Sequence, residues 1–493
     1  MKRNFCFNLA VLLGIAAVSN CFAGTLDLSE PMKASLVYLD ISSSSYDLSQ
    51  PWNPLPISKK SGYGCAVGPY EVLTIAENVT NATYIQTRCY GQNVYVPATV
   101  KIVDYEYNLC LLELDKPAMG KPLTPLSFIE SFPKGEQLTA YWLSSGNHLT
   151  TSQATLDRAE MSRSLVSFVS ALTFFATNVS RPFGDGQVCC HESDPIGIAA
   201  WGTETDVGII PAETINRFLS HCKKESYSGF SSSGFRASAL LDPARRKYLK
   251  LPDDIKHGMY VSDVYTIGTG CKDLQLGDVI LSIDGNQLNP YGRYEHPDYK
   301  RISFSHILSQ IPDGTQIPFE IIRNGEIMAL EITGSNVASD NMLVPYYLYD
   351  RQPEYFVTGG YIFQRLNRDY LGMWGNEMSG NAPPHLYHYQ KDFSYKPTQE
   401  REDIVILSYV MPAEINLGYQ QLSHLVVDSV NGMKIASMKH FADTVTAAEN
   451  DDVLEITFEM DSPVLIIPKS QLTSANAQIS RLYGISKMMH LGE

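Results

Sequence analysis

The sequence predicts a mainly β protein of several domains, with smaller α+β modules in its second half. The chain has 493 residues, of which 44% are hydrophobic and 18% charged, and this suffices for about three ordinary cores. Short apolar runs between turn residues fill residues 35–218, as in Glu71–Thr74 and Leu109–Leu114, and helical periodicity is scarce there. Such runs predict paired β-barrels or a β-sandwich.

The first residues resemble a leader. A basic start precedes the apolar run Leu9–Val18, and small residues then occupy Cys21 and Ala23. This pattern predicts a signal peptide over residues 1–23 and export to the periplasm or secretion, with an N-terminal core helix as the other reading. Asn20 disfavours a lipid anchor at Cys21, because lipoprotein signals resemble one another in having a small residue there. No later stretch reaches 18 consecutive apolar residues, so no membrane span is expected.

The net charge limits the classes of partner, and the number of cysteines limits how their thiols can pair. The 38 Lys and Arg residues stand against 53 Asp and Glu, which gives a formal net charge of −15. A field of this sign opposes non-specific binding to nucleic acid or anionic lipid, so neither is expected as a partner. The cysteines beyond the leader are odd in number, so an oxidising compartment would leave at least one thiol unpaired. They are Cys65, Cys89, Cys110, Cys189, Cys190, Cys222 and Cys271.

The second half of the chain carries one small module twice. A Ser- and Gly-rich joint at residues 226–234 is followed by the alternating run Leu274–Gly285, which ends in an Asp-Gly turn. Ile317–Ile332 predicts a hairpin that pivots on Asn324-Gly325. His424–Gly432 and Val453–Phe458 repeat the strand, the turn and the closing strand. We expect the aromatic stretch 346–395 between the two modules to be an irregular insertion or a lid-like decoration.

The first half resembles the trypsin-like domain of the Deg/HtrA proteases. Gly64–Val67 and Val72–Val79 are similar to the first barrel of that family, and Asn108–Leu114 resembles its aspartate-bearing strand. Gly184–Gly186 and Ile196–Gly202 resemble the region around its serine and the strand that follows. The resemblance implies a chymotrypsin-like double β-barrel.

The second half resembles two PDZ domains of the same family. Ser233–Arg236 stands where such domains bind the carboxylate of a peptide, and His257–Val261 is similar to the strand that follows. Tyr355–Phe363 and Ile415–Gly418 are most similar to the second PDZ domain of the plant-type branch. The expected organisation is a degenerate trypsin-like domain over residues 24–228, a first PDZ domain over 229–335, and a second, PDZ-like domain with the aromatic insertion over 336–493.

The catalytic triad of this family is missing from the sequence. By motif, the histidine position holds Glu77, the aspartate position holds Asn108, and the serine position holds Asp185, or Gly184 if the gap is placed differently. No histidine precedes His148, so the first barrel supplies no imidazole base. Gln187-Val-Cys-Cys-His also replaces the Gly-Gly-Pro turn of the family, which disfavours an intact oxyanion site. The sequence therefore argues against a serine protease.

Other residues near this position offer weaker chemistry. Cys189 or Cys190 with His191 would supply a thiol and an imidazole, but neighbours on a strand point to alternate faces. Residues 189–194 contain metal-ligand types without a recognisable spacing, so no metal site is predicted. Glu77 and Asp185 would form a carboxylate pair if they faced each other. The sequence predicts no catalytic residue and no cofactor.

The predicted peptide site is Ser233, Gly234, Phe235 and Arg236, because a PDZ domain captures a peptide terminus on backbone N–H groups beside a sheet edge. A plain turn from linker to strand is the alternative reading. Gly359-Gly360 is a second, weaker candidate for such a loop.

These observations favour an exported, catalytically inactive Deg/HtrA-like protein. It would act as a peptide-binding, chaperone-like or regulatory scaffold in protein quality control, with C-terminal or unfolded peptide segments as ligands. The family also implies homo-oligomers built on trimers. Tyr46 and Trp52 are candidate contacts, and capping of the barrel is the equal alternative for them. One alternative is an endopeptidase with a relocated nucleophile, and a second is a purely structural oligomer.

Overall fold

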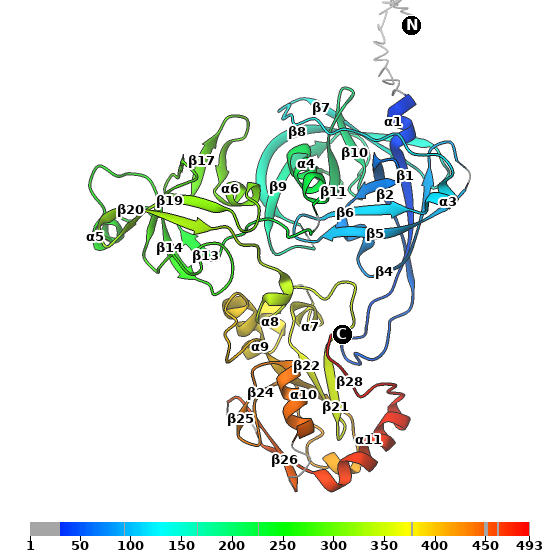
Figure 1. Ribbon diagram of the computed structural model, residues 1–493, viewed down its shortest axis with the longest axis vertical. Coiled ribbons are helices and arrows are strands. Elements are labelled where there is room, and N and C mark those ends of the chain that lie inside the picture. Colours follow the sequence, from blue (N-terminus) through cyan, green and yellow to red (C-terminus); the bar gives the residue numbers. More distant parts are fainter. Residues whose placement is uncertain are drawn as a thin grey trace, which may run out of the picture.

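The computed structural model describes residues 30–492 except 93, 165, 225, 376–377, 448–451 and 461–462. The expected signal peptide, with Cys21, lies outside the described residues. Figure 1 shows two β-barrels side by side, a middle unit beside the second barrel, and a last unit below them. In the described part of the chain, no helix is both long and apolar enough to cross a membrane.

The first barrel closes in the strand order β1-β2-β3-β6-β5-β4. Alternating apolar side chains of its strands, such as Val37, Leu39 and Ile41, fill the interior. Its strands are β1 (Leu36–Ser43), β2 (Ser58–Gly68), β3 (Glu71–Thr74), β4 (Ala82–Cys89), β5 (Val96–Asp104) and β6 (Leu109–Leu114). Its helices are α1 (Glu30–Ser35), α2 (Ala76–Val79) and α3 (Lys116–Met119).

The second barrel closes in the order β10-β11-β12-β9-β8-β7, and α4 packs outside it. Its strands are β7 (Gln137–Leu143), β8 (Leu149–Arg163), β9 (Ser170–Asn178), β10 (Val188–His191), β11 (Asp194–Gly202) and β12 (Asp206–Pro211), and the helix is α4 (Ala212–His221). Two closed barrels confirm the predicted mainly β, chymotrypsin-like double barrel.

The middle unit is an antiparallel sheet in the order β13-β14-β15-β19-β20, with β16 on β15 and a separate hairpin β17-β18. The predicted hairpin is confirmed, because β19 and β20 turn at Asn324 and Gly325, both with positive φ. The predicted strand at Leu274–Gly285 begins only at Val279, since the Gln275 amide donates to Asp278 Oδ2 at 2.7 Å and forms a turn. The elements are β13 (Phe235–Ser238), α5 (Pro243–Tyr248), β14 (Met259–Val264), β15 (Val279–Ile283), β16 (Asn286–Gln287), β17 (Arg293–His296), β18 (Lys300–Ser303), α6 (Ser305–Gln310), β19 (Gln316–Arg323) and β20 (Glu326–Thr333).

The last unit is an eight-stranded sheet in the order β27-β26-β24-β23-β22-β21-β28, with β25 on β24. The expected irregular insertion at 346–395 is wrong in part, because this stretch contains β21 and β22, which lie inside the sheet. Both strands are buried on both faces and show no alternation to detect. The strands are β21 (Tyr355–Thr358), β22 (Tyr361–Arg365), β23 (Val405–Val410), β24 (Leu425–Val430), β25 (Met433–Lys434), β26 (Val453–Phe458), β27 (Leu465–Pro468) and β28 (Met489–His490). The helices and helical turns are η1 (Ser339–Asn341), α7 (Arg368–Gly372), α8 (Met378–Asn381), α9 (Pro384–His388), η2 (Tyr389–Phe393), η3 (Glu414–Asn416), α10 (Met438–Ala447) and α11 (Lys469–Tyr483).

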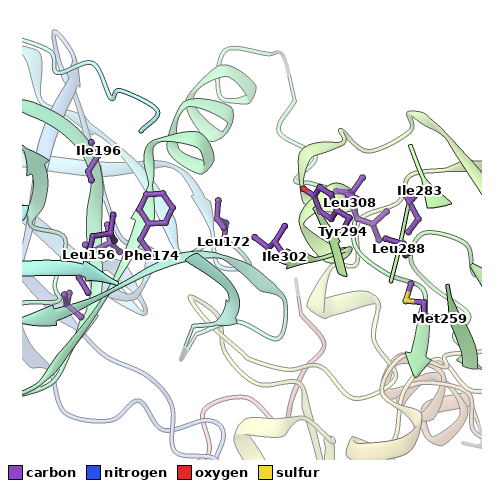
Figure 2. Packing of buried hydrophobic residues seen from close by; sticks show 14 of the residues in the cluster. Leu156, Leu172, Phe174, Ile196, Met259, Ile283, Leu288, Tyr294, Ile302 and Leu308 are labelled. Atoms are coloured by element: carbon purple, nitrogen blue, oxygen red, sulfur yellow. The ribbon is translucent and has the colours of Figure 1, made fainter. Parts of the chain in front are cut away.

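The second barrel and the middle unit share one hydrophobic cluster. Figure 2 shows Phe174 and Leu172 of the barrel continuing into Ile302 and Leu308 of the middle unit. The aromatic ring of Phe174 also lies 5.8 Å from that of Tyr299. Contacts of this kind fix the middle unit against the barrel by burial of apolar surface.

A polar network reinforces the same junction around Glu213 of α4. Its Oε1 accepts from Arg217 at 3.1 Å and Gln310 at 2.6 Å, and its Oε2 accepts from Tyr299 at 2.7 Å. His306 Nε2 lies 3.1 Å from the same carboxylate. Burial alone would raise the pKa of Glu213, but these donors together lower it to about 2. The carboxylate is therefore charged and held by groups from both units.

Candidate functional site

The three residues that the motif comparison assigns to the triad positions lie together where the barrels meet. Glu77 is on α2, and Asn108 precedes β6 in a positive-φ conformation. Asn108 Oδ1 accepts from the Glu77 amide at 2.9 Å, and Asn78 Nδ2 donates to the carbonyl of Asp185 at 2.9 Å. The Glu77 and Asp185 carboxylates also act on each other, because the charge of Asp185 raises the pKa of Glu77. The structure thus brings together Glu77, Asn108 and Asp185.

The turn that carries Asp185 depends on two glycines. A Cβ on Gly184 would lie 2.1 Å from the Gly202 nitrogen, and a Cβ on Gly186 would lie 2.2 Å from the Tyr63 carbonyl oxygen. Gly186 also has φ of +97°. The Tyr63 amide donates to the carbonyl of Asp185 at 2.9 Å, which ties this turn to the first barrel.

The amide that would stabilise an oxyanion is already bonded within the chain. In a chymotrypsin-like protease, the amide of the nucleophile residue is one of the two donors to the tetrahedral intermediate. Here the Asp185 amide donates to Gln187 Oε1 at 2.7 Å. An incoming carbonyl oxygen would have to displace the Gln187 side chain before it reached this donor.

The electrostatics of the barrel centre provide no ready base. Burial raises the pKa of Glu77, and Lys60 opposes this shift. Burial lowers the pKa of Lys60, whose Nζ donates to the carbonyl oxygen of Glu77 at 2.8 Å. Among the described residues, no histidine contributes to the hydrogen bonds or pKa shifts recorded for Glu77 and Asp185. The centre therefore lacks the pairing of nucleophile and imidazole that acyl transfer requires.

The cysteines next to this centre do not replace the nucleophile. Cys189 and Cys190 are buried, and burial raises the pKa of Cys190 to about 12 and that of Cys189 well above its usual value. His191 Nε2 lies 2.5 Å from a carboxylate oxygen of Glu136. All seven cysteines of the described region are free thiols, and that region contains no group of three or more His, Cys, Asp or Glu residues suited to a metal ion.

The second candidate site is a groove in the middle unit, between the edge strand β13 and helix α6. It is a cavity of about 510 Å³ whose lining includes Ser233, Phe235 and Arg236 of the predicted peptide site. Phe304 and Leu308 form the opposite wall, and the Phe235 and Phe304 rings stack with centroids 5.6 Å apart. Among the described residues, β13 pairs with β14 alone, which leaves its other edge open to an extended chain.

Gly234, the fourth predicted residue, serves the packing of the loop instead of lining the groove. A Cβ there would lie 2.6 Å from the Gly268 carbonyl carbon. The Gly234 amide donates to Thr269 O at 2.9 Å, and the Phe235 amide donates to Ser233 Oγ at 3.3 Å. Two amides of the predicted loop are therefore engaged, which favours recognition by side chains in the groove.

Comparisons with known proteins agree with this architecture. The family described as PDZ domain matches residues 344–490. "Putative protease Do-like 12, mitochondrial" of Arabidopsis thaliana is 23% identical over 449 residues, covering 88% of this chain and 84% of that protein. "Protease Do-like 2, chloroplastic" of the same plant is 25% identical over 449 residues, covering 89% of this chain and 72% of that protein. The chain is thus similar over most of its length to plant Do-like proteases, and it carries a PDZ domain.

A search of solved structures also found similar chains. The "HtrA-type protease AlgW with decapeptide" is 17% identical with a TM-score of 0.47, and the match covers 62% of this chain and 97% of that one.

The weaker candidate loop, in the last unit, is closed. Gly359 and Gly360 form the turn between β21 and β22. The Gly359 amide donates to Asn476 Oδ1 at 2.7 Å, and Asn416 Nδ2 donates to the Gly359 carbonyl at 2.9 Å. The prediction of a peptide-binding loop here is wrong, because side chains of the same unit already occupy its polar groups.

The start of the aromatic stretch 346–395, which the sequence singles out as an insertion or a lid-like decoration, covers one side of the barrel centre. Tyr347 and Tyr349 pack on Tyr105, with ring centroids 5.4 and 4.6 Å away. Asp350 Oδ1 accepts from the Asn81 amide at 2.7 Å. The sequence does not show which surface these tyrosines cover, because the barrel that they reach lies some 240 residues away in sequence.

The same segment is bound to a buried carboxyl pair, which the sequence analysis also missed. Tyr347 donates to Glu106 at 2.5 Å, and Tyr227, in the joint after the second barrel, donates to Asp104. Burial and the neighbouring charge of Asp104 raise the pKa of Glu106 to about 8. Both connecting segments of the chain are therefore hydrogen-bonded to one pair of carboxyl groups.

Proposed function

We propose that this Deg/HtrA-family protein is catalytically inactive and works as a peptide-binding scaffold, with a chaperone-like or regulatory role in protein quality control. The observation that carries the proposal is the contrast between its two sites. The barrel centre lacks nucleophile and imidazole and has its oxyanion amide bonded to Gln187, whereas the groove along β13 is hollow.

The groove offers the chemistry of strand addition. An extended peptide that pairs with the free edge of β13 would gain main-chain hydrogen bonds, and its apolar side chains would lie against Phe235, Phe304 and Leu308. C-terminal segments and unfolded chains both present such an extended backbone. They are the ligands that we propose.

The setting of this activity is also a proposal. We propose export on the basis of the leader-like residues 1–23, although the relatives named above are mitochondrial or chloroplastic. We further propose a homo-oligomer built on trimers, as in other members of the family.

Two measurements on the whole mature protein test the proposed function. Cleavage of reduced casein should be absent, and a fluorescein-labelled ten-residue peptide should bind saturably in fluorescence anisotropy. The variant Ala237→Trp should abolish binding, because Ala237 lines the groove and the indole would fill it. Leu276→Ala is the matched control, since Leu276 is 73% exposed on the same unit and lies outside the groove lining.

Other outcomes would point to the alternatives. Casein cleavage that disappears in Cys190→Ala would establish an endopeptidase with a relocated nucleophile. If the protein assembles into oligomers but binds no peptide, the purely structural oligomer becomes the supported function.

A further inference from the structure

The groove along β13 is lined by positive charge, although the chain as a whole is strongly negative. Three cationic side chains line the cavity, and none of the described residues that line it is Asp or Glu, in a protein with net charge −15. Arg163 comes from the end of β8 in the second barrel, Arg236 from β13, and Lys391 from η2 in the last unit. All three are exposed. Three separate units thus contribute positive charge to one cavity.

The charges of Asp263 and Asp392 act on Arg236, whose side chain also donates a hydrogen bond to Tyr265. Each of these carboxylates is nevertheless paired with another group. Asp263 lies directly opposite Arg236 across the strands, but its carboxylate is paired with Lys396 at 2.7 Å. Asp392, the other nearby acid, is paired with His388 at 2.8 Å. In the described parts of the chain, neither Arg163, Arg236 nor Lys391 takes part in an ion pair.

The two guanidinium groups act on the same wall of the cavity. Tyr395 lines this wall, and its ring stacks on Tyr265 with centroids 4.8 Å apart. Burial raises the pKa of Tyr395 to about 12, while the positive charges of Arg163 and Arg236 oppose that rise. Both cations are therefore close to one hydroxyl group. Ser232 Oγ, also in the lining, is buried without a partner among the described residues.

We propose that the groove selects acidic peptides: an Asp or Glu side chain of the segment added to β13 is bound by Arg163 and Lys391, beside Arg236. This inference rests on the proposed function and names its substrate class. Guanidinium groups bind carboxylates with charge-assisted and often bidentate hydrogen bonds. Such recognition replaces the two loop amides that the chain has already engaged.

The walls of the cavity favour a peptide over other anions. Phe168, Phe235, Phe304 and Tyr346 surround the cations with aromatic surface, which suits the side chains of a peptide. The overall charge of −15 opposes a polyanion such as nucleic acid.

The test uses matched ten-residue peptides and the whole mature protein. One fluorescein-labelled peptide carries two Glu residues among apolar ones, and its partner carries Gln at the same places; both are made with a free and with an amidated C-terminus. We expect the Glu peptide to bind about ten times more tightly than the Gln peptide at low salt. The difference should shrink as salt is raised and should persist in the amidated forms.

Single substitutions assign the preference to the named cations. Arg163→Gln should remove most of the preference for Glu while leaving the affinity for the Gln peptide unchanged, and Lys391→Gln should have a smaller effect of the same kind. Arg158→Gln is the matched control, because Arg158 lies on the same strand but is paired with Asp157 and Glu160.

The outcomes separate this inference from the function on which it rests. Equal affinity for the Glu and Gln peptides would overturn the acidic preference and leave peptide binding intact. If Arg163→Gln lowers the affinity for both peptides to the same degree, Arg163 has a structural role. This outcome would also overturn the acidic preference. Absence of binding to every peptide would overturn the proposed function itself.

Discussion

The barrel centre and the groove along β13 differ in how their polar groups are satisfied. At the barrel centre, the Asp185 amide and the Lys60 ammonium are hydrogen-bonded to groups of the same chain. In the groove, Arg163 and Arg236 face a cavity that no described carboxylate lines. A protein gains by satisfying polar groups internally unless a ligand is to satisfy them. The difference supports the groove as the working site and the barrels as its support.

The largest expected effect on stability comes from weakening the junction between the second barrel and the middle unit. Glu213→Ala removes the acceptor shared by Arg217, Tyr299 and Gln310 at the junction of barrel and middle unit. Breaking a buried charged network by removing one partner costs about 3 kcal/mol. Urea unfolding should show a loss of this size, and Glu213→Gln, which keeps an acceptor oxygen, should lose less. An unchanged midpoint for Glu213→Ala would mean that the apolar cluster alone holds the junction.

Restoring proteolytic activity at the barrel centre would test whether the hydrogen bond from the Asp185 amide to Gln187 closes that site. The triple variant Glu77→His, Asn108→Asp, Asp185→Ser should stay near background in casein cleavage, because the amide at position 185 remains bonded to Gln187. Adding Gln187→Gly should raise the rate about 100-fold, which is what one oxyanion donor contributes. Equal rates for the two variants would show that Gln187 is not what closes the centre.

The segment that covers the barrel centre should respond to pH. Because the folded pKa of Glu106 is raised to about 8, its protonated form stabilises the fold fully below about pH 4.5, and this stabilisation is lost as pH rises through about 8. The melting temperature should therefore fall by about 3 °C or more between pH 5 and pH 9. Glu106→Gln should flatten this dependence, whereas the exposed control Glu295→Gln should keep it. A wild-type slope that survives in Glu106→Gln would refute the assignment.

The smallest effect concerns the ion pair at the rim of the groove. Lys396→Met frees Asp263, which lies opposite Arg236 and would then compete with the ligand for it. The free energy of unfolding should fall by about 0.5 kcal/mol, as for other partly exposed pairs. The affinity for the Glu peptide should drop about twofold, and that for the Gln peptide should not change. An increase for the Glu peptide would indicate that Lys396 itself hinders the ligand.

Much of the fold could be predicted from the sequence because its signals are local. The Asn324-Gly325 hairpin, the strand Val453–Phe458 and the short runs of the barrels all show turn residues or repeated apolar patterns. Strands β21 and β22 were missed because both faces are buried and the alternation disappears. Helix α11 was missed because only Ile479 of its residues is buried, which leaves little apolar periodicity to detect.

The site residues also divide into those that a local motif predicts and those that depend on contacts between distant segments. Motif spacing was enough to bring Glu77, Asn108 and Asp185 together, since each lies at a fixed place in the barrel topology. The cations Arg163 and Lys391 were not predictable, because they reach the groove from other units and carry no local pattern. Contacts between distant segments depend on how the units pack, and one sequence does not display that.

The hydrophobic cluster that runs from the second barrel into the middle unit has a consequence for cooperativity. A unit that shares its core with a neighbour has no separate melting transition, because exposing one half of the cluster removes the partners of the other. The second barrel and the middle unit should therefore unfold as one block in calorimetry, although residue 229 was expected to begin a new domain. For an evolving chain, this ties the groove to the second barrel, because each supplies half of one shared core.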